Sequence, residues 1–164
     1  MNKVDVFAPE YIASVTSEPL FGIQDGCPAY IVVNGNLDKW NAVVDNSKKY
    51  DLKFVPLDHN IVINPTPETT YSLCDCMLYH EERWIALVEL KNQGKAWIEE
   101  AIAQLKSTIE LIQENPRVAT FPHREAYAAN LRFPAFKSSK KSRMNQFRND
   151  TRFRLIITNR IKAK

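Results

Sequence analysis

The clearest pattern of apolar and polar positions lies in the middle of the chain. Residues 70–79 read as a strand, residues 80–83 as a polar turn, and residues 84–90 as a second, nearly continuous apolar strand. Two strands joined by so short a turn predict an antiparallel hairpin. In residues 95–114, apolar side chains recur at steps of three and four, which predicts an amphipathic helix. Asn92 is the expected cap of its N-terminus, and Asn115-Pro116 ends it.

Weaker patterns flank this central part. They predict strands at residues 29–33, 52–55, 125–133 and 152–161, a basic helix at 137–148, a loosely helical segment at 4–18, and a short helix or irregular segment at 37–45. We see no internal repeat and no linker. The order of elements predicts one α/β domain over residues 1–164, with a central mixed β-sheet flanked by helices.

Composition narrows the class of protein. The chain has 164 residues, of which 45% are hydrophobic and 25% charged, as is typical of a soluble globular domain. No apolar run is long enough to span a membrane, and the first residues lack the apolar segment of a secretory signal. The three cysteines lack the spacing of a disulfide framework or a zinc site. We therefore expect a cytoplasmic protein with no membrane partner.

The net charge of +3 hides an asymmetry along the chain. Residues 132–164 contain eleven Lys or Arg and one acid, Asp150, whereas the preceding residues carry a net charge of −7. A segment of charge +10 is typical of a surface that contacts phosphates, and the alternative is a solvated basic tail. Apolar residues within the segment favour folded structure. The expected nucleic-acid contacts are Lys137, Lys140, Lys141, Arg143, Arg148 and Arg152.

The second arm of the hairpin ends in an acid and a lysine separated by one residue, Glu89-Leu90-Lys91. Side chains alternate between the faces of a strand, so Glu89 and Lys91 point the same way, roughly 6–7 Å apart along the backbone. If His80 lies opposite Trp84, then Asp75 lies opposite Glu89 on that same face. Two adjacent carboxylates repel each other unless a divalent cation binds between them, and oxygen ligands suit Mg²⁺ or Mn²⁺. Lys91 would then activate the attacking water of a phosphodiester hydrolase.

An acid-x-Lys triplet alone has little meaning, because ordinary composition yields about one in a chain of this size. A second copy, Asp51-Leu52-Lys53, has no apolar strand before it and no helix after it. The alternative for Asp75, Glu89 and Lys91 is an ordinary cross-strand salt bridge at a sheet edge, which contributes little to stability.

With these residues, the chain resembles the PD-(D/E)XK nuclease superfamily, whose fold is restriction-endonuclease-like. The resemblance covers residues 70–132 and rests on Asp75, Glu89-x-Lys91 and the order hairpin, helix, strand. It implies that Asp75, Glu89 and the Leu90 carbonyl bind the metal and that Lys91 serves the water. Gln104 matches the glutamine of a helix motif in the RecB-like branch, although Thr108 replaces that motif's tyrosine. The family pattern also has Pro where Cys74 stands, and Glu10 or Glu18 would supply a further ligand.

Two functions of different classes follow from these observations. The first is a Mg²⁺- or Mn²⁺-dependent nuclease, an endo- or exodeoxyribonuclease for which the resemblance implies DNA as the substrate. The second is a non-catalytic module that binds nucleic acid or a partner protein on the same fold, since a fold alone does not determine function. The small size of the chain is compatible with a homodimer or a partner protein.

Overall fold

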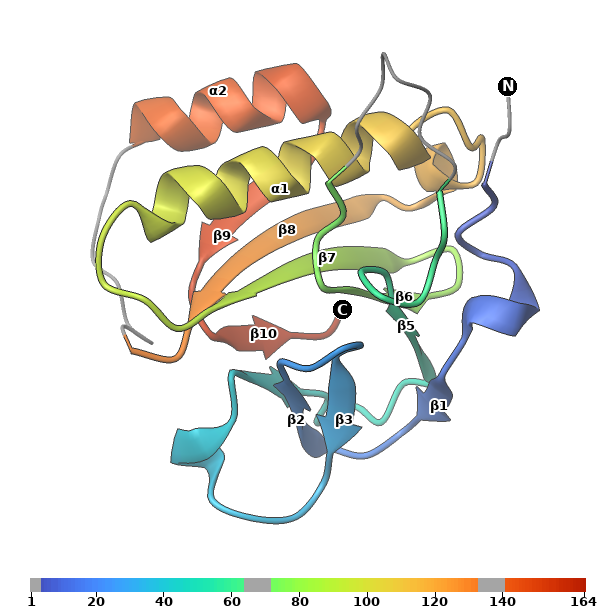
Figure 1. Ribbon diagram of the computed structural model, residues 1–164. Coiled ribbons are helices and arrows are strands. Elements are labelled where there is room, and N and C mark those ends of the chain that lie inside the picture. Colours follow the sequence, from blue (N-terminus) through green and yellow to red (C-terminus); the bar gives the residue numbers. More distant parts are fainter. Residues whose placement is uncertain (1–3, 64–71, 133–140) are drawn as a thin grey trace.

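The computed structural model describes residues 4–63, 72–132 and 141–164, which form two β-sheets and two α-helices (Figure 1). The larger sheet has six strands in the order β1-β5-β6-β7-β8-β9. These strands are β1 (Ser14–Thr16), β5 (Leu52–Pro56), β6 (Cys76–His80), β7 (Trp84–Lys91), β8 (His123–Asn130) and β9 (Arg154–Ile157). Strands β1, β5, β6 and β7 pair antiparallel, whereas β7, β8 and β9 pair parallel. The sheet is therefore mixed.

The smaller sheet has four strands in the order β10-β4-β2-β3. Its members are β2 (Leu20–Gln24), β3 (Tyr30–Val32), β4 (Ala42–Asp45) and β10 (Arg160–Lys162). Strand β10 runs parallel to β4, and the other pairs are antiparallel. The sheet thus joins the N-terminal part of the chain to the strand that follows β9.

Two helices make the connections between the parallel strands. Helix α1 (Trp97–Ile112) links β7 to β8, and α2 (Lys141–Thr151) lies between β8 and β9 in the chain. Parallel neighbours require such crossovers, because a tight turn joins only antiparallel strands. Short 3₁₀ segments occur at η1 (Pro9–Tyr11), η2 (Leu37–Lys39) and η3 (Val118–Thr120). Among the described residues, neither helix is long and apolar enough to cross a bilayer.

The larger sheet buries both of its faces, but against different layers. Leu87 of β7 belongs to a core that includes Leu105 of α1 and Phe147 of α2. Val88, the next residue, belongs to the other core, together with Phe21 of the smaller sheet. The α/β class and the mixed sheet are as predicted. The expectation of a sheet flanked by helices needs correction, since the helices cover one face and the smaller sheet covers the other (Figure 1).

The central predictions are confirmed. Strands β6 and β7 form the antiparallel hairpin with His80 opposite Trp84, and α1 occupies most of the predicted residues 95–114. Asn92 is not the N-cap, however, because Ala96 takes that position with a φ of 58°. Strands β3, β5 and β8 fall within or near the predicted residues 29–33, 52–55 and 125–133, although residue 133 lies outside the described part.

The structure corrects three weaker predictions. Residues 4–18 contain η1 and β1 in place of a helix, because Val6 and Phe7 enter the core from irregular backbone before Pro9. Residues 37–45 contain η2 and then β4. The single strand predicted at 152–161 is two strands, β9 and β10, which belong to different sheets.

The strand predicted at residues 70–79 begins later, at Cys76. Residues 70 and 71 lie outside the described part, and residues 72–75 are not in a strand. The Cys74 amide donates a 2.7 Å hydrogen bond to the Thr108 hydroxyl of α1, which ties this approach segment to the helix layer. Asp75 is thereby held at the last position before the sheet.

A close approach in the smaller sheet yields a prediction about stability. A Cβ at Gly22 would lie 2.3 Å from Cδ2 of the buried Trp40 ring. We expect Gly22→Ala to lower the free energy of unfolding by about 1–3 kcal/mol, the usual cost of overpacking. Urea unfolding measures the change.

Gly94→Ala is the matched control, because its Cβ would meet only the far end of the Arg132 side chain, at 3.3 Å. Equal unfolding free energies for the two variants would contradict the packing of Trp40 on Gly22.

Candidate functional site

The hairpin register places two acidic side chains opposite each other. Cys76 pairs with Val88, so the next position outward brings Asp75 opposite Glu89, as predicted. Leu87 of β7 faces the helix layer, and alternation along this strand puts Glu89 on that same face. Asp75 precedes β6, and its side chain is hydrogen-bonded to that of Glu89. Both carboxyl groups therefore lie at one end of the hairpin, beneath the level of α1.

Backbone and side-chain hydrogen bonds fix this pair. The Leu90 amide donates to Oδ2 of Asp75 at 2.7 Å. A hydrogen bond between the two carboxyl groups raises the pKa of Glu89 and lowers that of Asp75. Only 5% of Glu89 is exposed, because β7 is paired on both sides and Ala128 of β8 lies beside it.

The environment raises the pKa of both carboxyl groups. Burial is the largest cause for Glu89, followed by the charge of Asp75, and together they raise its pKa to about 9. Burial also raises the pKa of Asp75, although the Leu90 amide opposes this shift. Without a cation, the pair retains a proton at neutral pH, since two buried carboxylates side by side are unfavourable.

Lys91 lies within reach of this pair. Its Nζ is 3.2 Å from Oε2 of Glu89 and 3.7 Å from Oε2 of Glu100, and its side chain is 16% exposed. Gln93 donates a 2.7 Å hydrogen bond to the same Glu100 oxygen. Glu100 was not among the predicted residues, and the signal for it is its place in the first turn of α1, directly after β7.

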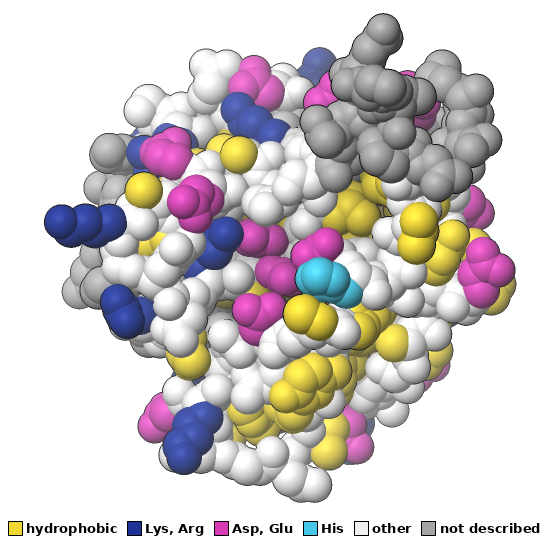
Figure 2. All heavy atoms as spheres, in the orientation of Figure 1, with side chains coloured by type: hydrophobic (Ala, Val, Ile, Leu, Met, Phe, Trp, Pro, Cys, Tyr) yellow, Lys and Arg dark blue, Asp and Glu magenta, His cyan; other side chains and the backbone are white. Residues whose placement is uncertain are grey.

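Two further acids act on Asp75, and the sequence patterns did not indicate them. The charges of Asp25 and Asp58 contribute to the raised pKa of Asp75. Asp58 follows β5, where the Leu57 amide donates to the Asp75 carbonyl at 2.9 Å, and Asp25 follows β2 in the smaller sheet. Figure 2 shows acidic side chains gathered beside a histidine in the middle of this face. The acidic site therefore draws on both sheets.

Three residues that the family resemblance suggested have other surroundings. The carbonyl oxygen of the Gln104 side chain accepts a hydrogen bond from Ser72. Among the interactions of the described residues, none joins Gln104 to Asp75 or Glu89. Glu10 lies in η1 and Glu18 precedes β2; both are exposed. Neither is among the charges that shift the pKa of Asp75 or Glu89.

The second acid-x-Lys triplet has a different environment. Asp51 is exposed, and Lys53 binds Oε1 of Glu81 at 2.6 Å near the surface. Among the described residues, neither Asp51 nor Lys53 forms an ion pair with a buried carboxyl group. The two triplets share a pattern and differ in burial and in the acid on the neighbouring strand.

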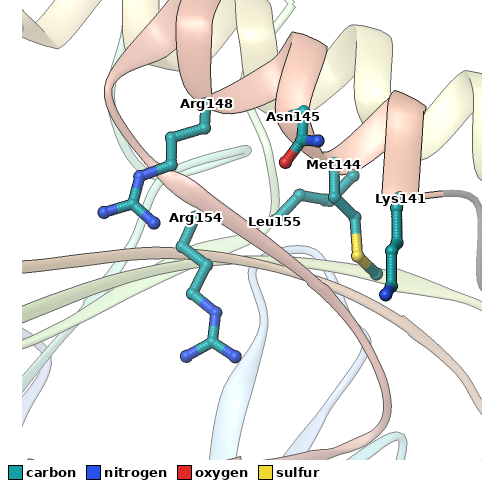
Figure 3. Close-up of a pocket in the computed structure, with 6 residues that line it drawn as sticks. All are labelled: Lys141, Met144, Asn145, Arg148, Arg154 and Leu155. Carbon is teal, nitrogen blue, oxygen red and sulfur yellow. The ribbon is translucent and has the colours of Figure 1, made fainter.

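The predicted basic contacts lie around α2. Lys141, Arg143 and Arg148 are on the helix, and Arg152 follows it with a φ of 66°. Arg143 forms an ion pair with Glu99 of α1, whereas Lys141 and Arg148 point toward β9 (Figure 3). Lys137 and Lys140 lie outside the described residues.

The donor groups fit an open Mg²⁺ or Mn²⁺ site. Among the described residues, no three His, Cys, Asp or Glu side chains are arranged closely enough to enclose an ion. Mg²⁺ needs no such cage, because one or two carboxylates hold it while waters and substrate phosphates complete its coordination. Asp75 and Glu89 are such a pair, and the raised pKa of Glu89 reflects the cost of two adjacent buried carboxylates, which a cation would relieve.

No protein-family model, curated protein or solved structure matches this chain.

The raised pKa of Glu89 predicts how stability depends on pH in the absence of metal. Folded Glu89 keeps its proton up to about pH 9, whereas in the unfolded chain it loses it near 4.5. Because the folded state binds more protons between these values, the free energy of unfolding falls as pH rises, by up to about 1.4 kcal/mol per unit. Glu89→Gln lacks this loss, so its free energy of unfolding rises relative to that of the wild type as pH rises. Urea unfolding in EDTA between about pH 5 and 8 measures it.

Glu110→Gln is the control, because Glu110 is an exposed acid of the same helix that carries Glu100. In Glu110→Gln, the free energy of unfolding should depend on pH with the same slope as in the wild type. A Glu89→Gln slope equal to that of the wild type would refute the shared proton.

Proposed function

We propose that this protein is a Mg²⁺- or Mn²⁺-dependent nuclease that hydrolyses phosphodiester bonds in DNA. The observation that carries the proposal is the buried, hydrogen-bonded pair of Asp75 and Glu89 with the Lys91 ammonium 3.2 Å from Glu89. Burial of carboxyl groups that are not matched by equal positive charge is costly, and groups perturbed in this way are candidates for a functional site.

The proposed roles follow from the positions of the side chains. Asp75 and Glu89 hold the cation, with the carbonyl of Leu90, whose amide already contacts Asp75. The bound cation would neutralise charge on the phosphate and ease deprotonation of the attacking water. Lys91 orients that water and the phosphate oxygens, and Glu100 keeps its ammonium beside the pair.

The order of elements supports the same proposal. An antiparallel hairpin, β6-β7, is followed by α1 and by the parallel strand β8, which is the order on which the resemblance to PD-(D/E)XK nucleases rests. Asp75 stands at the start of one hairpin arm and Glu89-x-Lys91 at the end of the other. We propose DNA as the substrate because of that resemblance and because of the basic residues around α2.

The first test is metal-dependent cutting. We expect the purified protein to cut plasmid or oligonucleotide DNA with Mg²⁺ or Mn²⁺ and not with EDTA. Lys91→Ala should slow cutting by at least about 10²-fold, the contribution of a positioned acid–base group. Asp75→Asn should abolish it, since one cation ligand is lost. Gel electrophoresis of end-labelled substrate measures both.

Asp51→Asn and Lys53→Ala are the matched controls, because they alter the exposed copy of the same triplet. Both should cut as the wild type does. Binding without cutting in any metal would refute the nuclease and favour the non-catalytic module.

A second test measures cation binding through the melting temperature of the protein. A ligand that binds only the folded state at a hundredfold excess over its Kd adds about 2.7 kcal/mol, which raises the Tm on the order of 5–10 °C in a domain of this size. We expect Mn²⁺ to produce this shift in the wild type and in Asp51→Asn. The shift should vanish in Asp75→Asn, and its persistence there would place the ion elsewhere.

A further inference from the structure

A pocket of about 200 Å³ lies between α2 and β9 (Figure 3). Four of its residues lie at steps of three and four on one face of α2, and β9 supplies the other two. The lining residues are Lys141, Met144, Asn145, Arg148, Arg154 and Leu155. In Figure 3 the Arg148 and Arg154 side chains extend from the two elements toward the same side.

The charge of this pocket is uncompensated. Its lining holds three cations and no acid. Within the described part of the chain, Lys141, Arg148 and Arg154 form no ion pair, whereas the neighbouring Arg143 binds Glu99 and Lys106 binds Asp150 at 3.1 Å. The cations on the α1 side of α2 are thus neutralised, and those on the β9 side are not.

The chemistry of the lining suits a phosphate group. Guanidinium groups bind phosphate oxygens by paired, charge-assisted hydrogen bonds, and the Asn145 amide adds a neutral donor. A volume of 200 Å³ equals that of about seven waters in the liquid, which leaves room for a phosphate and part of its hydration. Met144 and Leu155 provide an apolar wall for an attached sugar.

We propose that the α2–β9 pocket binds a backbone phosphate of the nucleic acid. The choice of nucleic acid rests on the proposed nuclease function, whereas the phosphate site rests on the pocket itself. Arg154 was not among the predicted contacts, although it lies in the same basic segment. The pocket joins it to Lys141 and Arg148, and Arg143 and Arg152 are not among the lining residues.

The sheet register sets the span between the two sites. Arg154 pairs with Glu125, which pairs with Ala86, five positions before Lys91 on β7. Strand rise and spacing then put the Arg154 and Lys91 backbones roughly 19 Å apart. Double-stranded DNA advances 3.4 Å per base-pair step along its axis, so this span corresponds to roughly five or six steps of a duplex lying across both sites.

Binding without metal tests this proposal separately from cutting. We would measure fluorescence anisotropy of a labelled duplex in EDTA, over a salt series, for the wild type and for Arg148→Gln/Arg154→Gln. Loss of one phosphate contact should lower the slope of log K against log salt by about 0.9 and weaken binding about tenfold. The control is Arg160→Gln/Lys162→Gln, which removes the same charge from exposed positions of β10. Circular dichroism checks that both variants fold.

The outcomes separate the sources of the phosphate. If a duplex with a 5′-phosphate loses affinity in the pocket variant and a 5′-hydroxyl duplex does not, the pocket holds a chain end. If both duplexes lose affinity equally, it holds an internal phosphodiester. Equal binding by the pocket and control variants overturns the proposal. It is also overturned if a polyglutamate peptide binds the wild type as tightly as DNA and loses affinity in parallel. Cutting by a protein that fails this test would leave the nuclease function standing.

Discussion

The register of the β6–β7 hairpin is the constraint on which the site depends. With Cys76 opposite Val88, the chain must bring Asp75 beside Glu89, and a shift of one residue would send these carboxyl groups to opposite faces. The Leu90 amide then holds Asp75 in place. The apolar pairs deeper in the hairpin stabilise the register. Their packing offsets the unfavourable contact between the two acids at its end.

The larger sheet is buried on both faces, and this explains why the two acids at the end of the hairpin interact so strongly. Strand β7 has partners on both sides, a helix layer above and the smaller sheet below, so the end of the strand stays poorly solvated even at its last residues. Low solvation raises the pKa of Glu89 and makes any positive charge nearby more effective. The uncompensated cations lie two strands away, where Arg154 of β9 meets Lys141 and Arg148 of α2. Acidic and basic surfaces are thus separated by the width of the parallel strands.

The sequence sufficed for those elements whose pattern is local. The hairpin and α1 have long, unambiguous apolar periods, and from them the pairing of Asp75 with Glu89 followed by counting. The smaller sheet was largely missed because its strands are short and are defined only by partners distant in the chain, such as β10 beside β4. For the same reason Asp25 and Asp58 carried no signal, since only the tertiary fold brings their charges to Asp75. The apolar positions of residues 4–18 imitate a helix but reach the core from irregular backbone.

The two acid-x-Lys triplets have the same sequence pattern and differ in how their charges are balanced. Lys53 faces a half-exposed Glu81, where solvent screens the pair and the interaction contributes little. Lys91 lies beside Glu89 and Glu100, and Asp75 in turn lies beside Glu89. The single positive charge of Lys91 cannot balance three carboxylates. A proton makes up part of the difference in the free protein. A divalent cation would make up more of it and would release that proton, which is why burial, and not the triplet itself, argues for metal chemistry at this end of the hairpin.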